Sequence, residues 1–175
     1  MSGASLGDDG FLRFVRGEFE SWRIPYEAVC FEITETAAIA NFARASEVIR
    51  ELKAEGCGFS LDDFGSGMSS FGYLKHLPVD HLKIDGVFIR DIAHDRVDRA
   101  MVEAINNVGH IMGITTIAEC VETVETLAVL QDIGVDYAQG FGIARPALYV
   151  GLSSLDATVV ADEERGSAPS PSAQR

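Results

Sequence analysis

The hydrophobic positions of this chain follow two spacings that alternate along its length. Short apolar runs are typical of buried strands, whereas apolar residues recurring every three or four positions mark one face of a helix. The helical spacing predicts helices over residues 11–22, about 39–55, 97–112 and 123–133. The short runs predict strands over residues 29–34, 58–61, 81–85, 115–119 and 135–140. Alternation of this kind predicts an α/β fold with a parallel sheet and helices outside it.

Two architectures agree with this alternation, a doubly wound open sheet and a (β/α)₈ barrel. In both of them the carboxyl ends of the parallel strands carry the functional side chains. The sequence has no Gly-x-Gly-x-x-Gly after its first strand and no Walker loop. A Rossmann domain that binds a nucleotide cofactor is therefore disfavoured.

Charged and amide side chains stand at the ends of all five predicted strands. They are Glu32, Asp62, Asp63, Lys83, Asp85, Glu119 and Gln139. A ring of acids with one lysine on parallel strands is typical of a two-metal phosphoester site. Because every ligand would be an oxygen atom, Mg²⁺ or Mn²⁺ is favoured over Zn²⁺.

Asp62 and Asp63 are neighbours in the sequence and repel one another unless a cation lies between them. Neighbouring side chains on an extended strand point to opposite faces, so the backbone must turn for both carboxylates to reach one site. The alternative is an acidic turn in which Asp63 caps the segment that follows. The pair alone does not decide between these two readings.

Composition narrows the class of protein. The chain has 175 residues, of which 47% are hydrophobic, and this suits one globular domain. A net charge of −13 and a pI of about 4.6 disfavour direct binding to nucleic acid. Three scattered cysteines predict free thiols, and no apolar stretch reaches membrane-spanning length. The polar first ten residues do not read as a signal peptide, so we expect a cytoplasmic protein or the cytoplasmic portion of a larger one.

Five motifs, in order, resemble one bacterial family. They are Phe31-Glu32-Ile33-Thr34-Glu35, Asp62-Asp63-Phe64-Gly65-Ser66-Gly67, Leu82-Lys83-Ile84-Asp85, Ala118-Glu119-Cys120-Val121-Glu122 and Gln139-Gly140-Phe141. Together, over about residues 3–148, they resemble the EAL-domain cyclic-di-GMP phosphodiesterases. The resemblance implies a TIM-type barrel that hydrolyses cyclic di-GMP to linear pGpG with Mg²⁺ or Mn²⁺. It places a partial EAL domain at residues 1–150 and a C-terminal end at 151–175, which we expect to be disordered from about residue 161.

The resemblance also implies the roles of the metal ligands. Glu32 would bind one metal ion, Asp62 would bridge two, and Asp63 and Glu119 would bind the second. Lys83 would orient or help to activate the attacking water. Without the motif, a salt bridge between Lys83 and Asp85 would be an equal alternative.

Three further residues take roles around the ligands by the same resemblance. Gln139 would lie beside the substrate or the attacking water, and Glu122 would support the ligands from outside. Glu35 would hold the loop after Asp63 in place. The alternatives are that Glu122 caps the next helix and that Glu35 is plain surface. The loop after Asp63 and the segment that follows it would be packing residues or the face of a homodimer.

The sequence departs from the family near its start. It has neither the Glu-Ala-Leu segment nor the later Asn-x-Ser, so two expected metal ligands are missing. We expect the chain to begin inside the third strand and to form an incomplete barrel with about five of eight strands. Cys120 stands where the family usually has glycine. We expect weak or no catalysis, and the alternative is a non-catalytic module that binds cyclic di-GMP or another protein.

Overall fold

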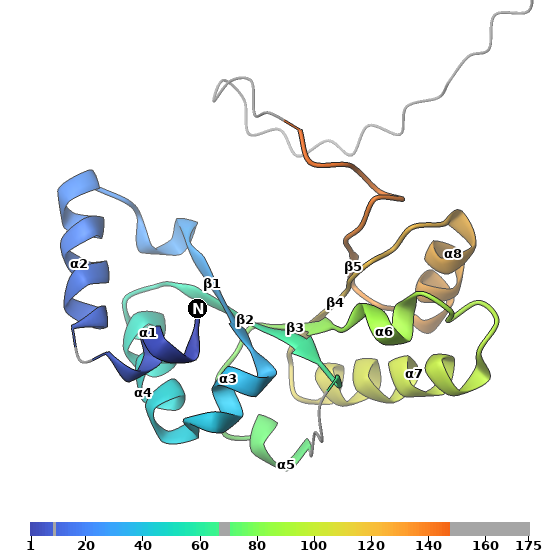
Figure 1. Ribbon diagram of the computed structural model, residues 1–175, viewed down its shortest axis with the longest axis horizontal. Helices are drawn as coiled ribbons and strands as arrows, with labels where there is room; N and C mark the ends of the chain where they lie inside the picture. Colours follow the sequence, from blue (N-terminus) through green and yellow to red (C-terminus); the bar gives the residue numbers. More distant parts are fainter. Residues whose placement is uncertain (9, 67–70, 148–175) are drawn as a thin grey trace, which may run out of the picture. The chain divides into compact units, whose positions relative to one another are not determined.

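The computed structural model describes residues 1–8, 10–66 and 71–147 (Figure 1). Residues 1–145 form one compact unit, and residues 146–175 are a separate unit. The predicted disorder from about residue 161 and part of the loop after Asp63 lie outside the described residues. Within the described ranges, no helix is long and apolar enough to cross a membrane.

Five strands lie at the predicted positions. They are β1 (Cys30–Thr34), β2 (Gly58–Phe64), β3 (His81–Ile84), β4 (Thr115–Ala118) and β5 (Tyr137–Ala138). The helices are α1 (Gly3–Gly7), α2 (Phe11–Trp22), α3 (Glu35–Ala40), α4 (Phe42–Ala54), α5 (Phe71–Leu74), α6 (Gly86–Ile89), α7 (Arg96–Ile111) and α8 (Val124–Ile133), with a 3₁₀ turn η1 at Tyr26–Ala28. Helices α1, α5 and α6 were not predicted, because four or five residues are too few to show a helical period.

One expectation about the elements is wrong. The predicted helix over about 39–55 is two helices, because Asn41 between α3 and α4 has φ −140° and ψ 60°, which is not helical. The expected start inside a strand stays a prediction: Met1 and Ser2 precede α1 without a strand assignment, and the amino group of Met1 donates to the carbonyl of Glu32 in β1. Leu6 of α1 is fully buried, so this short helix is part of the hydrophobic core.

The order of the strands decides between the two architectures. All neighbouring strands are parallel, and they lie in the order β1-β2-β3-β4-β5 (Figure 1). A doubly wound sheet reverses its strand order at a switch point, whereas a barrel wall keeps the order of the sequence. The incomplete barrel is therefore confirmed.

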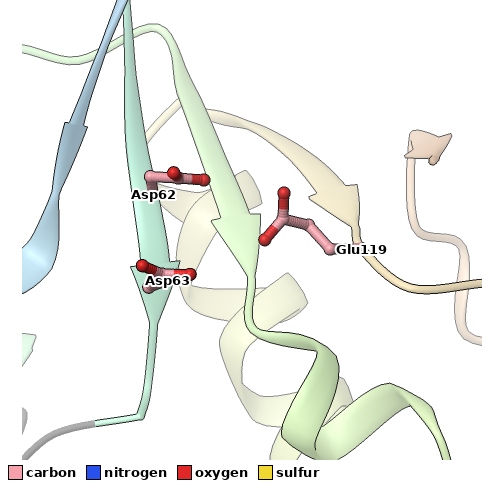
Figure 2. Close-up of side chains that lie close together, drawn as sticks. All are labelled: Asp62, Asp63 and Glu119. Atoms are coloured by element: carbon pink, nitrogen blue, oxygen red, sulfur yellow. The ribbon is translucent and has the colours of Figure 1, made fainter. Parts of the chain in front are cut away.

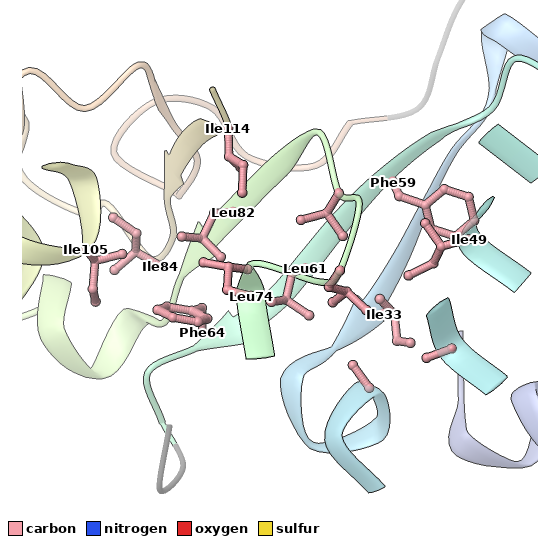
Figure 3. Close-up of a cluster of buried hydrophobic side chains, with 14 of the residues drawn as sticks. Ile33, Ile49, Phe59, Leu61, Phe64, Leu74, Leu82, Ile84, Ile105 and Ile114 are labelled. Atoms are coloured by element: carbon pink, nitrogen blue, oxygen red, sulfur yellow. The ribbon is translucent and has the colours of Figure 1, made fainter. Parts of the chain in front are cut away.

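Strand register separates the core from the functional face. Ile33 is opposite Leu61, and Leu61 is opposite Leu82, and all three are fully buried (Figure 3). Burying each such side chain contributes roughly 1.5–3 kcal/mol. Because side chains alternate between faces, Glu32, Asp62 and Lys83 belong to the opposite face from this apolar row. Sheet packing thus places the charged strand ends on one side.

Side-chain caps begin the helices that follow the strands. Thr123 accepts from the backbone N–H of Thr126 at 3.1 Å and caps α8, as its position in the sequence predicts. Since Thr123 is the N-cap, the alternative in which Glu122 caps this helix is wrong. Asp85 accepts from the backbone N–H of Val87 at 2.8 Å and caps α6. These caps fix where α8 and α6 begin after the strands that carry the candidate site.

Candidate metal centre

A bulge in β2 lets two adjacent carboxylates share one site. Leu61 is opposite Leu82, but Phe64 is opposite Ile84, so three steps along β2 match two steps along β3. The backbone of Asp63 is left-handed, with φ 55°, a conformation that Asp tolerates better than most residues. Such a bulge inserts one extra residue and turns a side chain to a new direction. The backbone turn that the convergence of Asp62 and Asp63 requires is therefore present.

The bulge brings Asp62 and Asp63 to Glu119, the residue after β4. Each of the three offers one carboxylate oxygen, and these oxygens lie within 4.8 Å of one another (Figure 2). Three oxygen ligands at this separation suit a hard divalent cation such as Mg²⁺ or Mn²⁺. The donor set of the site therefore fits the expected metal.

Lys83 lies among the carboxylates. Its Nζ atom is 2.7 Å from an oxygen of Asp62, 2.7 Å from one of Glu119 and 3.1 Å from one of Glu32. The lysine side chain is only 6% exposed. The alternative salt bridge to Asp85 is not what forms, because Lys83 pairs across the strands and Asp85 caps α6. One buried cation thus gathers acids from three strand ends.

Burial and charge shift the pKa values of this cluster. Burial acts to lower the pKa of Lys83, but its bonds to Asp62, Glu119 and Glu32 outweigh burial and raise the pKa. Burial, followed by the charges of Asp62 and Asp85, raises the pKa of Asp63. Burial also raises the pKa of Glu119, although Lys83 opposes the shift. A further cation beside Asp63 and Glu119 would therefore favour their ionised forms.

Glu35 joins the two ends of the loop that follows Asp63. It begins α3 and is 2% exposed, so the alternative of a surface residue is wrong. Its carboxylate accepts from the backbone N–H of Gly65 at 3.1 Å and from the hydroxyl of Tyr73. Burial and the neighbouring Glu35 raise the pKa of Tyr73. The hydrogen bond from Tyr73 to Glu35 was not predicted from the sequence, because the two residues are far apart in the chain.

Gln139 and Glu122 line a hollow beside Glu119. The backbone N–H of Gln139 donates to Ala118 at 2.8 Å, which sets Gln139 next to the end of β4. Both side chains are exposed. The hollow has a volume of about 220 Å³ and is lined by Glu119, Cys120, Glu122, Gln139, Gly140 and Phe141. Gln139 therefore lies near Glu119 of the cluster, and Glu122 lines the same hollow.

Cys120 has a structural constraint that its sequence position alone did not reveal. Its backbone is left-handed, with φ 54°, directly after the ligand candidate Glu119. Its side chain packs on Gly86, where an added Cβ would lie 2.5 Å from the Cys120 sulfur. A left-handed cysteine is strained, which accounts for the usual glycine in the motif.

Comparisons with known proteins agree with the resemblance. The EAL domain family matches residues 1–146. A cyclic di-GMP phosphodiesterase of Shewanella oneidensis, PdeB, is 49% identical over 146 residues, which cover 83% of this chain and 17% of PdeB. PdeA of Borreliella burgdorferi, also named a cyclic di-GMP phosphodiesterase, is 39% identical over 141 residues, covering 81% of this chain and 21% of PdeA. The chain thus spans about a fifth of the length of these relatives.

Solved structures share the fold. The PaMucR phosphodiesterase in complex with c-di-GMP has a TM-score of 0.79 and 36% identity, covering 83% of this chain and 59% of that one. Klebsiella pneumoniae BlrP1, in a complex with manganese and cyclic di-GMP, has a TM-score of 0.75 and 30% identity, covering 81% of this chain and 36% of that one. With its five motifs, its sheet order and these matches, the chain belongs to the EAL domain family.

Proposed function

We propose that this chain is part of a cyclic-di-GMP phosphodiesterase domain, which hydrolyses one phosphodiester bond of cyclic di-GMP to give pGpG. The observation that carries the proposal is the cluster of Asp62, Asp63 and Glu119, two of which, Asp62 and Glu119, are paired with the ammonium group of Lys83. The names of PdeB and PdeA support the substrate, and the manganese complex of BlrP1 supports a divalent cation.

Asp62, Asp63 and Glu119 would hold Mg²⁺ or Mn²⁺. Glu32 is the next candidate ligand, because its half-exposed carboxylate already reaches the same lysine. A divalent ion held there would supply a Lewis acid that lowers the pKa of a water molecule to near neutrality. The chain's own contribution is to gather several carboxylates in one place, which the two backbone turns at Asp63 and Cys120 make possible.

Lys83 would act as a fixed positive charge. Because its carboxylate partners raise its pKa, the ammonium group stays protonated at neutral pH and is no proton acceptor. It would orient the attacking water through Asp62 and offset negative charge that develops on the phosphate oxygens. Gln139, at the same strand edge, offers an amide that could donate to the phosphodiester or to the water.

A second candidate is a module that binds cyclic di-GMP without hydrolysing it. Among the described residues, one group of three potential metal ligands is gathered, whereas a two-metal mechanism needs ligands for two ions. The sequence also has no Glu-Ala-Leu segment. Weak or absent turnover with retained binding would follow from this.

The deciding experiment measures pGpG release and Mn²⁺ binding with the purified chain. Asp62→Asn should abolish Mn²⁺ binding and leave the circular dichroism spectrum unchanged. Asp132→Asn, a control at an exposed aspartate paired with Arg99, should bind Mn²⁺ normally. Release of pGpG that depends on Asp62 supports the phosphodiesterase, and binding of cyclic di-GMP without pGpG supports the binding module. A chain that does neither contradicts both.

A further inference from the structure

The backbone turns at Asp63 and after Glu119 both contain left-handed residues. Asp63 has φ 55°, and Cys120, directly after Glu119, has φ 54°. Gly65, two residues after Asp63, has φ 97°. For residues other than glycine this conformation costs free energy, and it persists only where the surrounding structure holds it in place. The groups that hold these turns therefore decide where the carboxylates of Asp63 and Glu119 lie.

Helix α6 lies against both turns. The chain leaves β3 beside the carboxylate cluster and enters α6 after one residue (Figure 2). At Gly86, the first residue of the helix, an added Cβ would lie 2.5 Å from the sulfur of Cys120. Two residues further on, the side chain of Phe88 packs on Gly65. One short helix is thus in contact with both turns that place candidate ligands.

The contact at Gly65 is made by the end of the Phe88 ring. A Cβ on Gly65 would lie 2.7 Å from Cε2 of Phe88 and 3.4 Å from its Cζ, so the ring fills the space that a side chain would need. Phe88 is half-buried and packs against the hydrophobic core. The same Cβ would lie 3.5 Å from Cδ1 of Ile105, a buried residue of α7. Gly65 is therefore packed against side chains of the two helices that follow β3.

The turn at Asp63 needs such a restraint when no metal ion is bound. The negative charges of Asp62 and Asp85 act on the carboxylate of Asp63, and the charge of Lys83 opposes them. Like charges repel, so a turn that is free to move would carry Asp63 away from Asp62. Glycine is the most permissive residue of the backbone, and Gly65 allows that movement unless it is held. A ligand that is already in place when the ion arrives binds it more tightly.

We propose that Phe88 is a positioning residue of the metal centre, whose ring holds Gly65 and thereby the turn that aims Asp63 at a divalent cation. The ring acts through the backbone and offers no ligand atom to the ion. The proposal rests on the proposed function, because it requires a divalent cation at Asp63. An ordinary packing residue differs from Phe88 in a measurable way, since its loss lowers stability without changing the affinity for the ion.

The first test measures the Kd for Mn²⁺ by isothermal titration calorimetry. Phe88→Leu removes Cε2 and Cζ, the two atoms that reach Gly65, and keeps an apolar side chain. The Kd should rise roughly 10- to 100-fold, the range typical of residues that orient metal ligands. Phe88→Met serves if the leucine variant does not fold, and it should also raise the Kd, because a flexible thioether excludes fewer positions than a rigid ring.

Two control variants separate positioning from stability. Ile49→Val, at a fully buried position of α4, removes core packing and should bind Mn²⁺ as the unsubstituted chain does. Val87→Ala, at an exposed position of α6, controls for a change in the helix itself and should also bind normally. A folded Phe88 variant with the Kd of Ile49→Val overturns the role of Phe88 alone. An unsubstituted chain that binds no Mn²⁺ overturns the proposed function and the positioning together.

The second test follows amide hydrogen exchange by NMR in the metal-free chain. The N–H of Gly65 donates to Glu35 at 3.1 Å, and the N–H of Gly58, at the other end of β2, donates to Val29 at 2.9 Å. In Phe88→Leu the amide of Gly65 should exchange faster, while the amide of Gly58 should exchange at its original rate. Equal changes at the two glycines would reflect overall stability alone and overturn the proposal.

Discussion

The Nζ atom of Lys83 lies 2.7 Å from a carboxylate oxygen of Asp62, on the strand next to its own. The same atom is 2.7 Å from Glu119, so two of the three candidate metal ligands are already paired with a cation of the chain. A divalent ion would therefore share its ligands with Lys83 or displace it from them. This relationship makes the lysine both a stabiliser of the metal-free chain and a competitor of the metal.

Replacing Lys83 by methionine separates these two effects. Without the ammonium group the partly buried carboxylates of Asp62 and Glu119 are left unpaired, and the free energy of unfolding in EDTA should fall by about 3 kcal/mol. The affinity for Mn²⁺, measured by isothermal titration calorimetry, should rise, because the competing charge is gone. Lys53→Met, which breaks an ion pair with Asp80, is the control and should leave Mn²⁺ affinity unchanged. Weaker Mn²⁺ binding by the Lys83 variant would contradict the competition.

The contacts of Glu35 predict that its replacement lowers the stability of the fold. Glu35→Ala leaves the backbone N–H of Gly65 and the hydroxyl of Tyr73 without their acceptor and should cost about 2–3 kcal/mol in urea unfolding. Tyr73→Phe removes one of the two donors and should cost about 1 kcal/mol. Glu47→Ala, at an exposed acid of α4, should change stability by less than about 0.5 kcal/mol. An alanine variant at Glu35 as stable as the one at Glu47 would refute the role of Glu35 in joining the ends of the loop.

The packing of Cys120 on Gly86 can be measured by a double-mutant cycle. Gly86→Ala forces a Cβ to within 2.5 Å of the Cys120 sulfur and should destabilise the chain by about 2 kcal/mol. Cys120→Gly removes the obstructing side chain and the left-handed strain. The double variant should therefore recover part of the loss, with a coupling of about 1–2 kcal/mol. Strictly additive effects would mean that Gly86 is constrained by something other than Cys120.

Asp136 predicts a defined pH dependence of stability. Burial acts to raise its pKa, but hydrogen bonds from the backbone N–H of Thr116, from His110 and from the Thr116 hydroxyl outweigh burial and lower the pKa below its usual range. A carboxyl group with a lower pKa in the folded state stabilises the fold above its unfolded pKa, and this stability is lost as the pH falls through the folded value. At pH 7 the contribution is complete.

Asp136→Asn should therefore be less stable than the unsubstituted chain at pH 7 by about 1 kcal/mol, a value reduced by the partial exposure of the aspartate. The difference between the two chains should shrink as the pH falls below about 4. Urea unfolding at pH 7, 5 and 3.5 measures it, and the comparison cancels the titration of the other acids. A difference that is constant with pH would show that hydrogen-bond geometry, not charge, stabilises this position.

Sequence patterns predicted much of the fold because they report burial. Apolar runs located all five strands, and Thr123 was recognised as a helix cap. The break at Asn41 was not predicted, because the apolar spacing continues across it while the backbone does not. The contact between Glu35 and Tyr73 was not predicted as a pair, because no local pattern encodes a hydrogen bond between residues so far apart.

For the candidate site, the sequence alone determined which chemistry stands at the strand ends. Alternation along parallel strands puts Glu32, Asp62 and Lys83 on one face, and the ordered motifs indicated the family. The tertiary structure decided how the charges meet. A bulge against β3 adds one residue to β2, so Asp63 turns toward Asp62 instead of away from it. Lys83 pairs with acids of neighbouring strands because the ends of these strands lie side by side. This proximity exists only once the sheet has formed, so no local sequence pattern reports it.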